Sequence, residues 1–575
     1  MAVISLLCSR ITTITVCPYA VSLPGHHFAI LVGITMKRTD LRFLLLTLLA
    51  LLLAACASAP EPAAKAPSGL TFIHMNDTYR VADVEDGTRG GFGRVVTTIR
   101  ALQAEGREVH VLHGGDLLSP SLESQIWFGG QMVQALNFID ALAPAYFIAG
   151  NHEFDIRDDD LGYFINAVRS SEFDWLGDNY RFKTGDEVAD SSINSEFTFE
   201  AGGKTIGVFA VTLHPEDGGT TRDYVEYERD YMGIVRRVIA GLEAQGVDMI
   251  IGLTHLYMED DIRLAALRKE HPKLEFIVGG HDHEMISHMQ SEDSAAIFKG
   301  SSNARVIWRI DVDFDAAGDA SIQASALPMD NSVAKDSGYQ VLEDQWRAEL
   351  LRLYPIIDVK VGTAAVRFDV TEESIRNDEN AWGNLIVDVA RSAFGEPQAD
   401  FAFINSGSIR IDDYIADDIT YEDIARTFGF PSQVRRIRVS GTEFKAMMEA
   451  GYRGAGRSEG YFPQVSGFRV CVDRSQPDFA RIVSLQVPSD NTWTEIDAAR
   501  DYAVILPSFI FGDRDGYRMP QSARESASLA GPELKYLLVD AIVKAQFENK
   551  AVGTAVDPGN PRYVALGPER QQCWQ

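Results

Sequence analysis

Cysteine is scarce in this sequence, and its spacing excludes two kinds of site. Five cysteines occur among 575 residues, and no two of them form a Cys-x-x-Cys motif. Zinc ribbons and thioredoxin-like redox centres depend on that motif, so we expect neither. Cys471 and Cys573 are able to pair in an oxidising compartment, but nothing in the sequence requires the bond.

Positive charge is also in short supply. Lysine and arginine number 53 against 82 aspartates and glutamates, which gives a net charge of −29. A nucleic-acid binder needs a basic surface to neutralise phosphates, so we expect no nucleic acid as a partner. The acidic excess is typical of a solvated surface, and a local basic pocket would still admit a small anionic substrate.

Histidine is absent beyond His288, although the chain runs to residue 575. A metal site that uses imidazole must therefore be built by the first half of the chain. The second half carries arginines and aromatic residues beside glycine turns, which suits a pocket for an anion and a ring. A chain of this length exceeds one hydrophobic core, so two large domains are expected.

One apolar run is long, and it lies near the N-terminus. Residues 41–53 are almost wholly apolar and follow a basic segment that opens at Met36. This length, followed by small residues, is typical of a secretory signal and not of a transmembrane span. Leu-Ala-Ala-Cys at the end of the run resembles the bacterial lipobox, and an ordinary signal peptide with a chance cysteine is the alternative.

The lipobox resemblance has implications for processing and location. It implies that Cys56 is acylated, becomes the mature N-terminus and holds the protein at a membrane. Outer-membrane sorting is expected, because the two residues directly after the cysteine, Ala57 and Ser58, are not acidic. The predicted segments are an upstream mis-assigned start, a lipoprotein signal peptide and an Ala/Pro-rich tether, at residues 1–35, 36–55 and 56–68.

From residue 69 to about Phe314, apolar strands alternate with amphipathic stretches, which predicts a layered α/β domain. The predicted helices are Gly93–Leu102, Gln131–Ile139, Ile234–Leu242 and Ile262–Leu267. A short charged helix over Gln345–Leu353 is expected to connect to a second domain. The predicted boundaries are 69–330 for the first domain, 331–355 for the linker, 356–566 for the second domain and 567–575 for a tail.

Five predicted strands each end in a loop that carries Asp, Asn or His. Ligands collect at the carboxyl ends of strands in α/β folds, so these loops predict one convergent metal site. A two-metal centre needs anionic or imidazole ligands, one of them bridging ions that lie about 3.5–4 Å apart. The loops contain Asn76-Asp77, Gly115-Asp116, Gly150-Asn151-His152-Glu153, His255 and Gly280-His281-Asp282-His283.

In this order and spacing the motifs resemble the calcineurin-like metallophosphoesterases, and residues 70–563 resemble bacterial 5′-nucleotidases of the UshA type. The resemblance implies a four-layer αββα N-terminal domain and a C-terminal α+β substrate-binding domain. It also implies two divalent ions (Zn, Mn, Co or Fe), bridged by Asp116. The other implied ligands are Asn151, His255 and His281 for one ion, and Asp77 and His283 for the other.

The same resemblance implies a catalytic pair. His152 would stabilise the transition state or protonate the leaving oxygen, and Asp155 would orient its imidazole and raise its basicity. The role of Glu153 stays open, and bracing the loop is one possibility.

The first loop departs from the family pattern. The family has Asp-x-His-Gly, whereas this chain has Asp77-Thr78-Tyr79-Arg80, so Tyr79 stands where a histidine ligand is expected. Three roles are open for Tyr79: binding an ion as phenolate, packing, or leaving the position to water. A two-metal site is still expected, because the other ligands are present.

The second domain carries residues that resemble the family's nucleotide pocket. Arg376, Asn405 and Arg410 would hold phosphate and ribose, although the segment Asn-Ser-Gly-Ser-Ile-Arg has serines where the family has glycines. Phe430 and Phe509 would sandwich the base. Core packing is the alternative for each ring.

Asp515 would reach the ribose hydroxyls of the same nucleotide. The resemblance then implies an extracytoplasmic enzyme that hydrolyses nucleoside 5′-monophosphates by attack of a metal-activated hydroxide, with UDP-sugars or 2′,3′-cyclic nucleotides as variants. A hinge rotation near residues 331–355 is also implied.

Two other functions are alternatives to this enzyme. One is a lipid-anchored nucleotide-binding protein that has lost turnover because Tyr79 replaces a histidine. The other is a sulfur-oxidation hydrolase of the same superfamily, against which the two phenylalanines argue. No protein partner is indicated.

Overall fold

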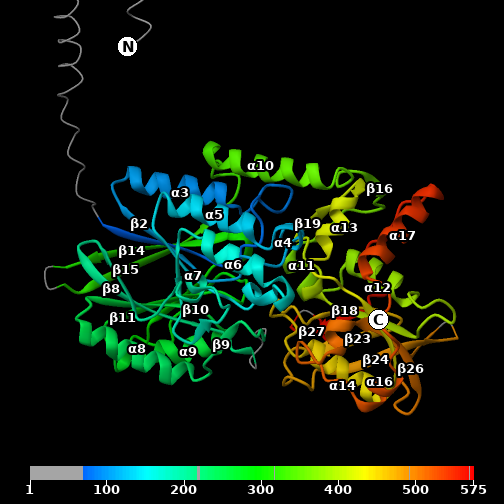
Figure 1. Ribbon diagram of the computed structural model, residues 1–575. Coiled ribbons are helices and arrows are strands. Elements are labelled where there is room, and N and C mark those ends of the chain that lie inside the picture. The colour runs from blue at the N-terminus through cyan, green and yellow to red at the C-terminus, as the bar shows by residue number, and fades with distance from the viewer. Residues whose placement is uncertain (1–68, 216–220, 316–317, 491, 569, 575) are drawn as a thin grey trace, which may run out of the picture. The chain divides into compact units, whose positions relative to one another are not determined.

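The computed structural model describes residues 69–215, 221–315, 318–490, 492–568 and 570–574 (Figure 1). The predicted upstream start, signal peptide and tether at residues 1–35, 36–55 and 56–68, with Cys56, lie outside the described residues. Within the described ranges, helices are too short or too polar to span a bilayer.

The first sheet of the N-terminal domain has seven strands. Its central strands are parallel and buried on both faces, which explains why they read as apolar runs in the sequence. In spatial order the strands are β15 (Ala320–Pro328), β14 (Val306–Phe314), β1 (Leu70–Met75), β2 (Glu108–His113), β3 (Ala145–Ile148), β4 (Asp174–Leu176) and β6 (Ile193–Asn194).

The second sheet has six strands, and β8, β10, β11 and β13 run parallel. In spatial order they are β12 (Ile286–His288), β13 (Ala296–Lys299), β11 (Leu274–Gly279), β10 (Met249–His255), β8 (Lys204–Thr212) and β7 (Phe197–Ala201). A separate antiparallel pair is formed by β5 (Tyr180–Phe182) and β9 (Val225–Tyr227).

Helices cover the outer face of each sheet (Figure 1). Over the first sheet lie α3 (Phe92–Ala104) and α5 (Gly130–Asp140), with α10 (Ser337–Leu353) packed against both of these helices. Over the second sheet lie α8 (Tyr231–Gln245) and α9 (Met258–Ala265). The predicted αββα architecture is confirmed. The other helices are α4 (Leu122–Trp127), α6 (Leu161–Ser170), α7 (Glu187–Asp190) and the 3₁₀ turns η1 (His152–Asp155), η2 (Asp158–Asp160), η4 (Ala266–Lys269) and η5 (Ser302–Ala304).

The helix that connects the domains begins earlier than predicted. The sequence predicted Gln345–Leu353, whereas α10 spans Ser337–Leu353. Asp336 caps the helix by accepting hydrogen bonds from the backbone N–H groups of Gly338 and Tyr339. Tyr339 is fully buried against the first sheet's helices, so tertiary packing orders a turn whose glycine weakens the local helix signal.

The C-terminal domain contains two four-stranded sheets and two strand pairs. In spatial order, the first sheet consists of β21 (Val434–Ser440), β26 (Asp501–Pro507), β18 (Phe401–Asn405) and β22 (Pro463–Ser466). The second consists of β25 (Thr492–Glu495), β24 (Ile482–Ser489), β23 (Arg469–Asp473) and β27 (Tyr563–Leu566). The pairs are β16 (Lys360–Thr363) with β20 (Asp418–Thr420), and β17 (Phe368–Val370) with β19 (Asp413–Ile415).

Helices flank these sheets, which makes the domain α+β as expected. They are α11 (Glu372–Asn377), α12 (Ala381–Arg391), α13 (Tyr421–Thr427), α14 (Gly441–Tyr452), α15 (Ser508–Phe511), α16 (Gln521–Ser526) and α17 (Leu534–Phe547), with the 3₁₀ turn η6 (Ser406–Ser408).

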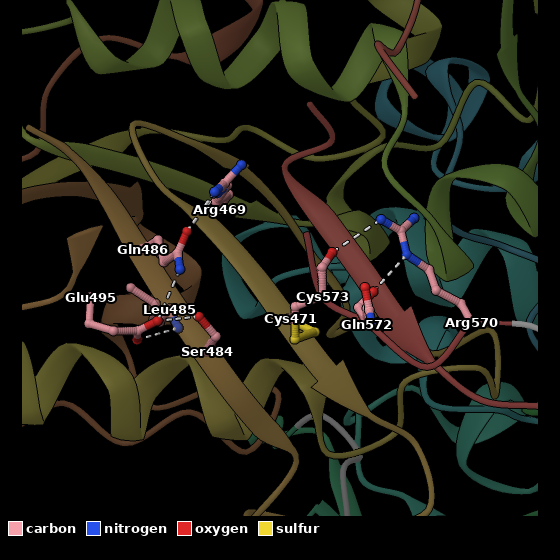
Figure 2. Close-up of a disulfide and its surroundings, with 9 residues drawn as sticks. All are labelled: Arg469, Cys471, Ser484, Leu485, Gln486, Glu495, Arg570, Gln572 and Cys573. Atoms are coloured by element: carbon pink, nitrogen blue, oxygen red, sulfur yellow. Dashed lines mark hydrogen bonds between the residues drawn. A yellow bond between two sulfur atoms is a disulfide. The ribbon is translucent and has the colours of Figure 1, made fainter. Parts of the chain in front are cut away.

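A disulfide ties the C-terminal segment to this domain. Figure 2 shows Cys471, on β23, bonded to Cys573, which lies 102 residues later in the chain. The guanidinium of Arg570 donates hydrogen bonds to the backbone carbonyls of Gln572 and Cys573. The pairing that the sequence left open is therefore formed in the structure.

Apolar and charged contacts join the two domains. Leu350 and Ile357 pack with Ala425, and α4 contributes Leu122 and Trp127 to the same cluster. Beside it, the Arg426 guanidinium lies 2.6 Å from the Glu123 carboxylate. The linker is therefore largely a packed helix, and the expected hinge rotation stays a prediction.

Candidate metal and catalytic site

The loops that follow β1, β2, β3, β10 and β11 meet at one end of the two sheets, as their motifs predicted. Four of the expected ligands have positive φ angles: Asp77 at 52°, Asp116 at 57°, His281 at 81° and His283 at 59°. This backbone region costs non-glycine residues about 1–3 kcal/mol and occurs at functional sites.

Glycine is required where the loops approach one another most closely. A Cβ atom on Gly150 would lie 2.2 Å from Asp116 Oδ1, and one on Gly280 would lie 2.3 Å from the carbonyl oxygen of Gly114. Both distances are below any ordinary contact. The motifs Gly-Asn-His-Glu and Gly-His-Asp-His therefore begin with glycine for steric reasons.

One group of donor atoms consists of Asp77, Asp116 and His283. One ligand atom from each of these residues lies within 4.8 Å of the other two. His283 Nε2 is 3.1 Å from Asp77 Oδ1. Both carboxylates are buried, so they need a neighbouring positive charge.

A second group lies on the other side of Asp116. Asn151 Oδ1 is 3.1 Å from His255 Nε2 and 3.2 Å from His281 Nδ1. His255 Nε2 is in turn 3.4 Å from Asp116 Oδ2. Asp116 thus belongs to both groups, which is the position of a bridging ligand.

The electrostatics of the cluster favour bound positive charge. Burial opposes ionisation of Asp77, yet neighbouring His283 holds the pKa of that carboxyl well below its usual range. Burial would lower the pKa of His255, but Asp116 outweighs it and raises that pKa to about 9. Glu372 and Asp77 likewise raise the pKa of His283 to about 9 against the effect of burial.

This donor set fits divalent metal ions. Carboxylate, imidazole and amide oxygen atoms are ligands for Zn, Mn, Fe and Co, and their negative charge would be neutralised by a cation. Asp77, Asp116, Asn151 and His255 are all buried, so the atoms are fixed in position. The residues present are therefore suited to the metals that the motifs implied.

Tyr79 places its hydroxyl inside the first donor group. The oxygen is 2.9 Å from His283 Nε2, 3.3 Å from Asp77 Oδ1 and 3.4 Å from Asp116 Oδ2. Burial, followed by the charges of both carboxylates, raises the pKa of the phenol well above its usual value. The side chain is 6% exposed and faces the cluster, so it does more than pack against neighbours.

His152 and Asp155 form the expected pair. His152 Nδ1 lies 2.7 Å from Asp155 Oδ2, to which Ser119 Oγ also donates a hydrogen bond of 2.9 Å. The backbone N–H of His152 donates to Asp116 Oδ1 at 2.8 Å, so the pair is attached to the metal ligands. His152 Nε2 is left facing Arg410 Nη2 at 3.4 Å.

The structure gives Glu153 a bracing role. Its buried carboxylate accepts backbone hydrogen bonds of 3.0 Å from Asp116, 2.6 Å from Leu117, 2.9 Å from Leu118 and 2.5 Å from Gly150. Burial, then the charge of Asp116, raises the pKa of this carboxyl to about 7. Glu153 therefore joins the β2 and β3 loops and fixes the backbone of Asp116.

The C-terminal domain brings some of its predicted residues to His152. The Arg410 guanidinium lies over the Phe430 ring, 5.8 Å from the centroid, and that ring is 5.8 Å from the His152 ring. Arg376 is paired with Glu372 and donates to the carbonyl oxygen of Ser458 at 3.4 Å.

Asn405 and Asp515 contact one another in this domain. Asn405 Nδ2 donates to Asp515 Oδ2 at 2.9 Å, and Ser408 Oγ donates to Asn405 Oδ1 at 2.7 Å. Ser408, one of the two serines that stand where the family has glycines, thus orients Asn405. Phe509, on α15, is 49% exposed and is not a core residue.

Sequence reasoning missed several residues at this site. Glu372 contacts His283 from the other domain, Ser119 contacts Asp155, and the Tyr257 ring lies perpendicular to the His281 ring at a centroid distance of 4.4 Å. None of these residues lies in a motif. Only Ser119 has a local signal, because it follows the Asp116 loop.

Both halves of the chain match known families. Residues 70–285 match the family model of the calcineurin-like phosphoesterases, in agreement with the two packed sheets and the donor cluster. A second model, the 5′-nucleotidase C-terminal domain, matches residues 360–522. The chain therefore combines an N-terminal calcineurin-like phosphoesterase domain with a C-terminal 5′-nucleotidase domain.

Curated relatives are similar along most of the chain. The trifunctional nucleotide phosphoesterase protein YfkN of Bacillus subtilis (strain 168) is 25% identical over 544 residues, which cover 87% of this chain and 35% of YfkN. An apyrase of Anopheles gambiae is 24% identical over 533 residues, which cover 85% of this chain and 91% of the apyrase. The chain thus spans about a third of YfkN and most of the apyrase.

A solved structure shares the fold. The 5′-nucleotidase precursor from Thermus thermophilus aligns with a TM-score of 0.72 and 21% identity, covering 86% of this chain and 99% of that chain. At this identity the likeness concerns the fold.

Proposed function

We propose that this protein is a metal-dependent phosphohydrolase that releases phosphate from nucleoside 5′-monophosphates, with UDP-sugars or 2′,3′-cyclic nucleotides as further substrates. The observation that carries the proposal is the convergence of two donor groups that share Asp116, beside the His152–Asp155 pair. Relatives described as nucleotide phosphoesterase and apyrase support a nucleotide as the substrate.

Each side chain in the proposed mechanism has a defined task. Divalent ions held by the two donor groups would polarise the phosphoryl oxygens and supply a hydroxide at neutral pH. His152 Nδ1–H donates a hydrogen bond to Asp155, which leaves Nε2 to carry the proton for the leaving oxygen. Arg410, 3.4 Å from that nitrogen, binds the phosphate through its guanidinium.

The C-terminal domain would hold the nucleoside. Asp515, which Asn405 orients, accepts hydrogen bonds from ribose hydroxyls. Burial raises the pKa of its carboxyl. Phe430 and Phe509 offer ring faces to the base, a contact that tolerates several bases.

A catalytically impaired nucleotide-binding protein is the second candidate, and the position of Tyr79 favours it. Its hydroxyl lies among the candidate ligand atoms, at the position where the family has a histidine ligand.

The two candidates differ in turnover. Metal-stripped protein is refilled with Zn²⁺, Mn²⁺, Co²⁺ or Fe²⁺ and phosphate release is measured from AMP, UDP-glucose, 2′,3′-cyclic AMP and p-nitrophenyl phosphate. Release from a nucleotide supports the enzyme, whereas tight AMP binding without release under any ion supports the binding protein.

Removing both predicted base-stacking rings is expected to weaken the binding of nucleotides but not that of small phosphate esters. The double variant Phe430→Ala, Phe509→Ala should raise KM for AMP at least about tenfold, since each stacked base contributes about 1–3 kcal/mol. KM for p-nitrophenyl phosphate should change little, because it has no base. Phe547→Ala, a change at an 84% exposed phenylalanine, is the matched control. Equal increases for both substrates would refute the base contact.

We also propose that the protein acts outside the cytoplasm, at the outer membrane, through a lipid on Cys56. The Cys471–Cys573 disulfide supports an oxidising compartment. In a bacterial host, Cys56→Ser is expected to move the protein from the membrane fraction to the soluble fraction. Continued membrane association of this variant after a high-salt wash would contradict the anchor.

A further inference from the structure

A carboxylate of the C-terminal domain reaches into the metal-ligand loops of the N-terminal domain. Glu372 is the first residue of α11, and its Oε1 atom lies 2.6 Å from His283 Nδ1. Its Oε2 atom accepts a hydrogen bond of 2.5 Å from Ser302 Oγ. The Glu372 side chain is 16% exposed, so these contacts are shielded from solvent.

The contact determines which nitrogen of His283 faces the donor group. When Nδ1 donates its proton to Glu372, Nε2 is the atom left to bind a cation. Nε2 is also the atom that faces Asp77, at 3.1 Å from its Oδ1. A carboxylate in this position fixes the tautomer and ring orientation of a metal-binding histidine and raises its basicity as a ligand.

Further hydrogen bonds hold Glu372 in place across the domain boundary. Its backbone N–H donates to Asp412 Oδ1 at 2.8 Å, and Asp412 Oδ2 accepts from Asn303 Nδ2 at 2.7 Å. Asn303 belongs to the N-terminal domain and accepts from the backbone N–H of Tyr79 at 3.0 Å. Arg305 adds an ion pair of 2.5 Å to Asp412. The network thus begins and ends at loops that carry the candidate ligands.

The same carboxylate is paired with Arg376, the arginine assigned above to substrate binding. Glu372 therefore contacts a metal ligand on one side and a substrate residue on the other.

We infer that Glu372 is a positioning residue, contributed by the C-terminal domain, that orients His283 for metal binding and makes metal affinity depend on how that domain is docked. The inference rests on the metal centre of the proposed function. By linkage, an ion at His283 must favour the docked arrangement as much as docking favours the ion.

The test is a metal titration of metal-stripped, full-length protein with Mn²⁺ in competition with a chelating dye. Glu372→Ala removes the acceptor and is expected to weaken Mn²⁺ binding about 10–100-fold, the usual cost of losing such an outer partner. Glu372→Gln keeps an oxygen that can accept from Nδ1, so it should recover most of that loss. Glu373→Ala, at the exposed neighbour on the same helix, should bind as the wild type does.

The outcomes distinguish a failure of the role assigned to Glu372 from a failure of the proposed metal centre. Wild-type affinity in Glu372→Ala would overturn the role of Glu372, and so would equal losses in the Ala and Gln variants. A wild type that binds no Mn²⁺ and releases no phosphate would instead contradict the metal centre itself. Thermal melting of the metal-free variants detects misfolding, which would lower the melting temperature before any metal is added.

Discussion

The variant Asp116→Asn is expected to lose phosphate release and metal together. Asp116 is the one residue that belongs to both donor groups, and its carboxylate is buried beside His255 and within reach of Tyr79. Asparagine has the same shape, but it lacks the charge and can offer only one oxygen to a cation. The loss of metal affinity should be larger than the loss of about 10–100-fold that follows removal of a residue that only hydrogen-bonds to a metal ligand.

The measurement combines metal content, by elemental analysis after dialysis, with phosphate release from AMP. Asp174→Asn, at an exposed aspartate on β4, is the matched control and should keep both properties. Asp116→Asn protein that retains its full metal content and activity would remove Asp116 from the proposed centre.

The variant His152→Ala is expected to lower turnover about 10²–10⁴-fold, the usual contribution of a general acid. The loss should depend on the leaving group. An alkoxide such as the ribose 5′-oxygen needs a proton, whereas p-nitrophenolate leaves without one. Turnover of AMP should therefore fall much further than turnover of p-nitrophenyl phosphate, while metal content stays unchanged.

Asp155→Asn provides the companion variant, since it weakens the orientation of His152 without removing the imidazole. It should show the same leaving-group dependence with a smaller loss. A fall of equal size for both substrates in His152→Ala would mean that the imidazole does not act on the leaving oxygen.

Apolar runs followed by polar loops were sufficient to predict the architecture. Strands β1, β2, β3, β10 and β11 are almost wholly buried, so their sequences are mainly apolar segments that end abruptly. Each ending coincides with a ligand motif. The predicted helix Ile262–Leu267 was less accurate, because α9 begins at Met258 and a 3₁₀ turn takes over at Ala266.

Contacts between distant segments could not be predicted in this way. Glu372 and His283 are 89 residues apart, and neither helix periodicity nor motif spacing relates them. The same limit applies to Tyr79, whose three possible roles the sequence left open. Only the loop conformation places its hydroxyl among the carboxylates, and its part in catalysis or metal choice stays a prediction.

The candidate ligands come from both sheets of the N-terminal domain. Asp77, Asp116 and Asn151 follow strands of the first sheet. In the second sheet, His255 is the last residue of β10, and His281 and His283 follow β11. A bound ion would therefore connect the two sheets through its ligands. A core substitution that shifts one sheet relative to the other would change the distances between the carboxylates and the imidazoles. Residues far from the loops are thus constrained by the metal centre.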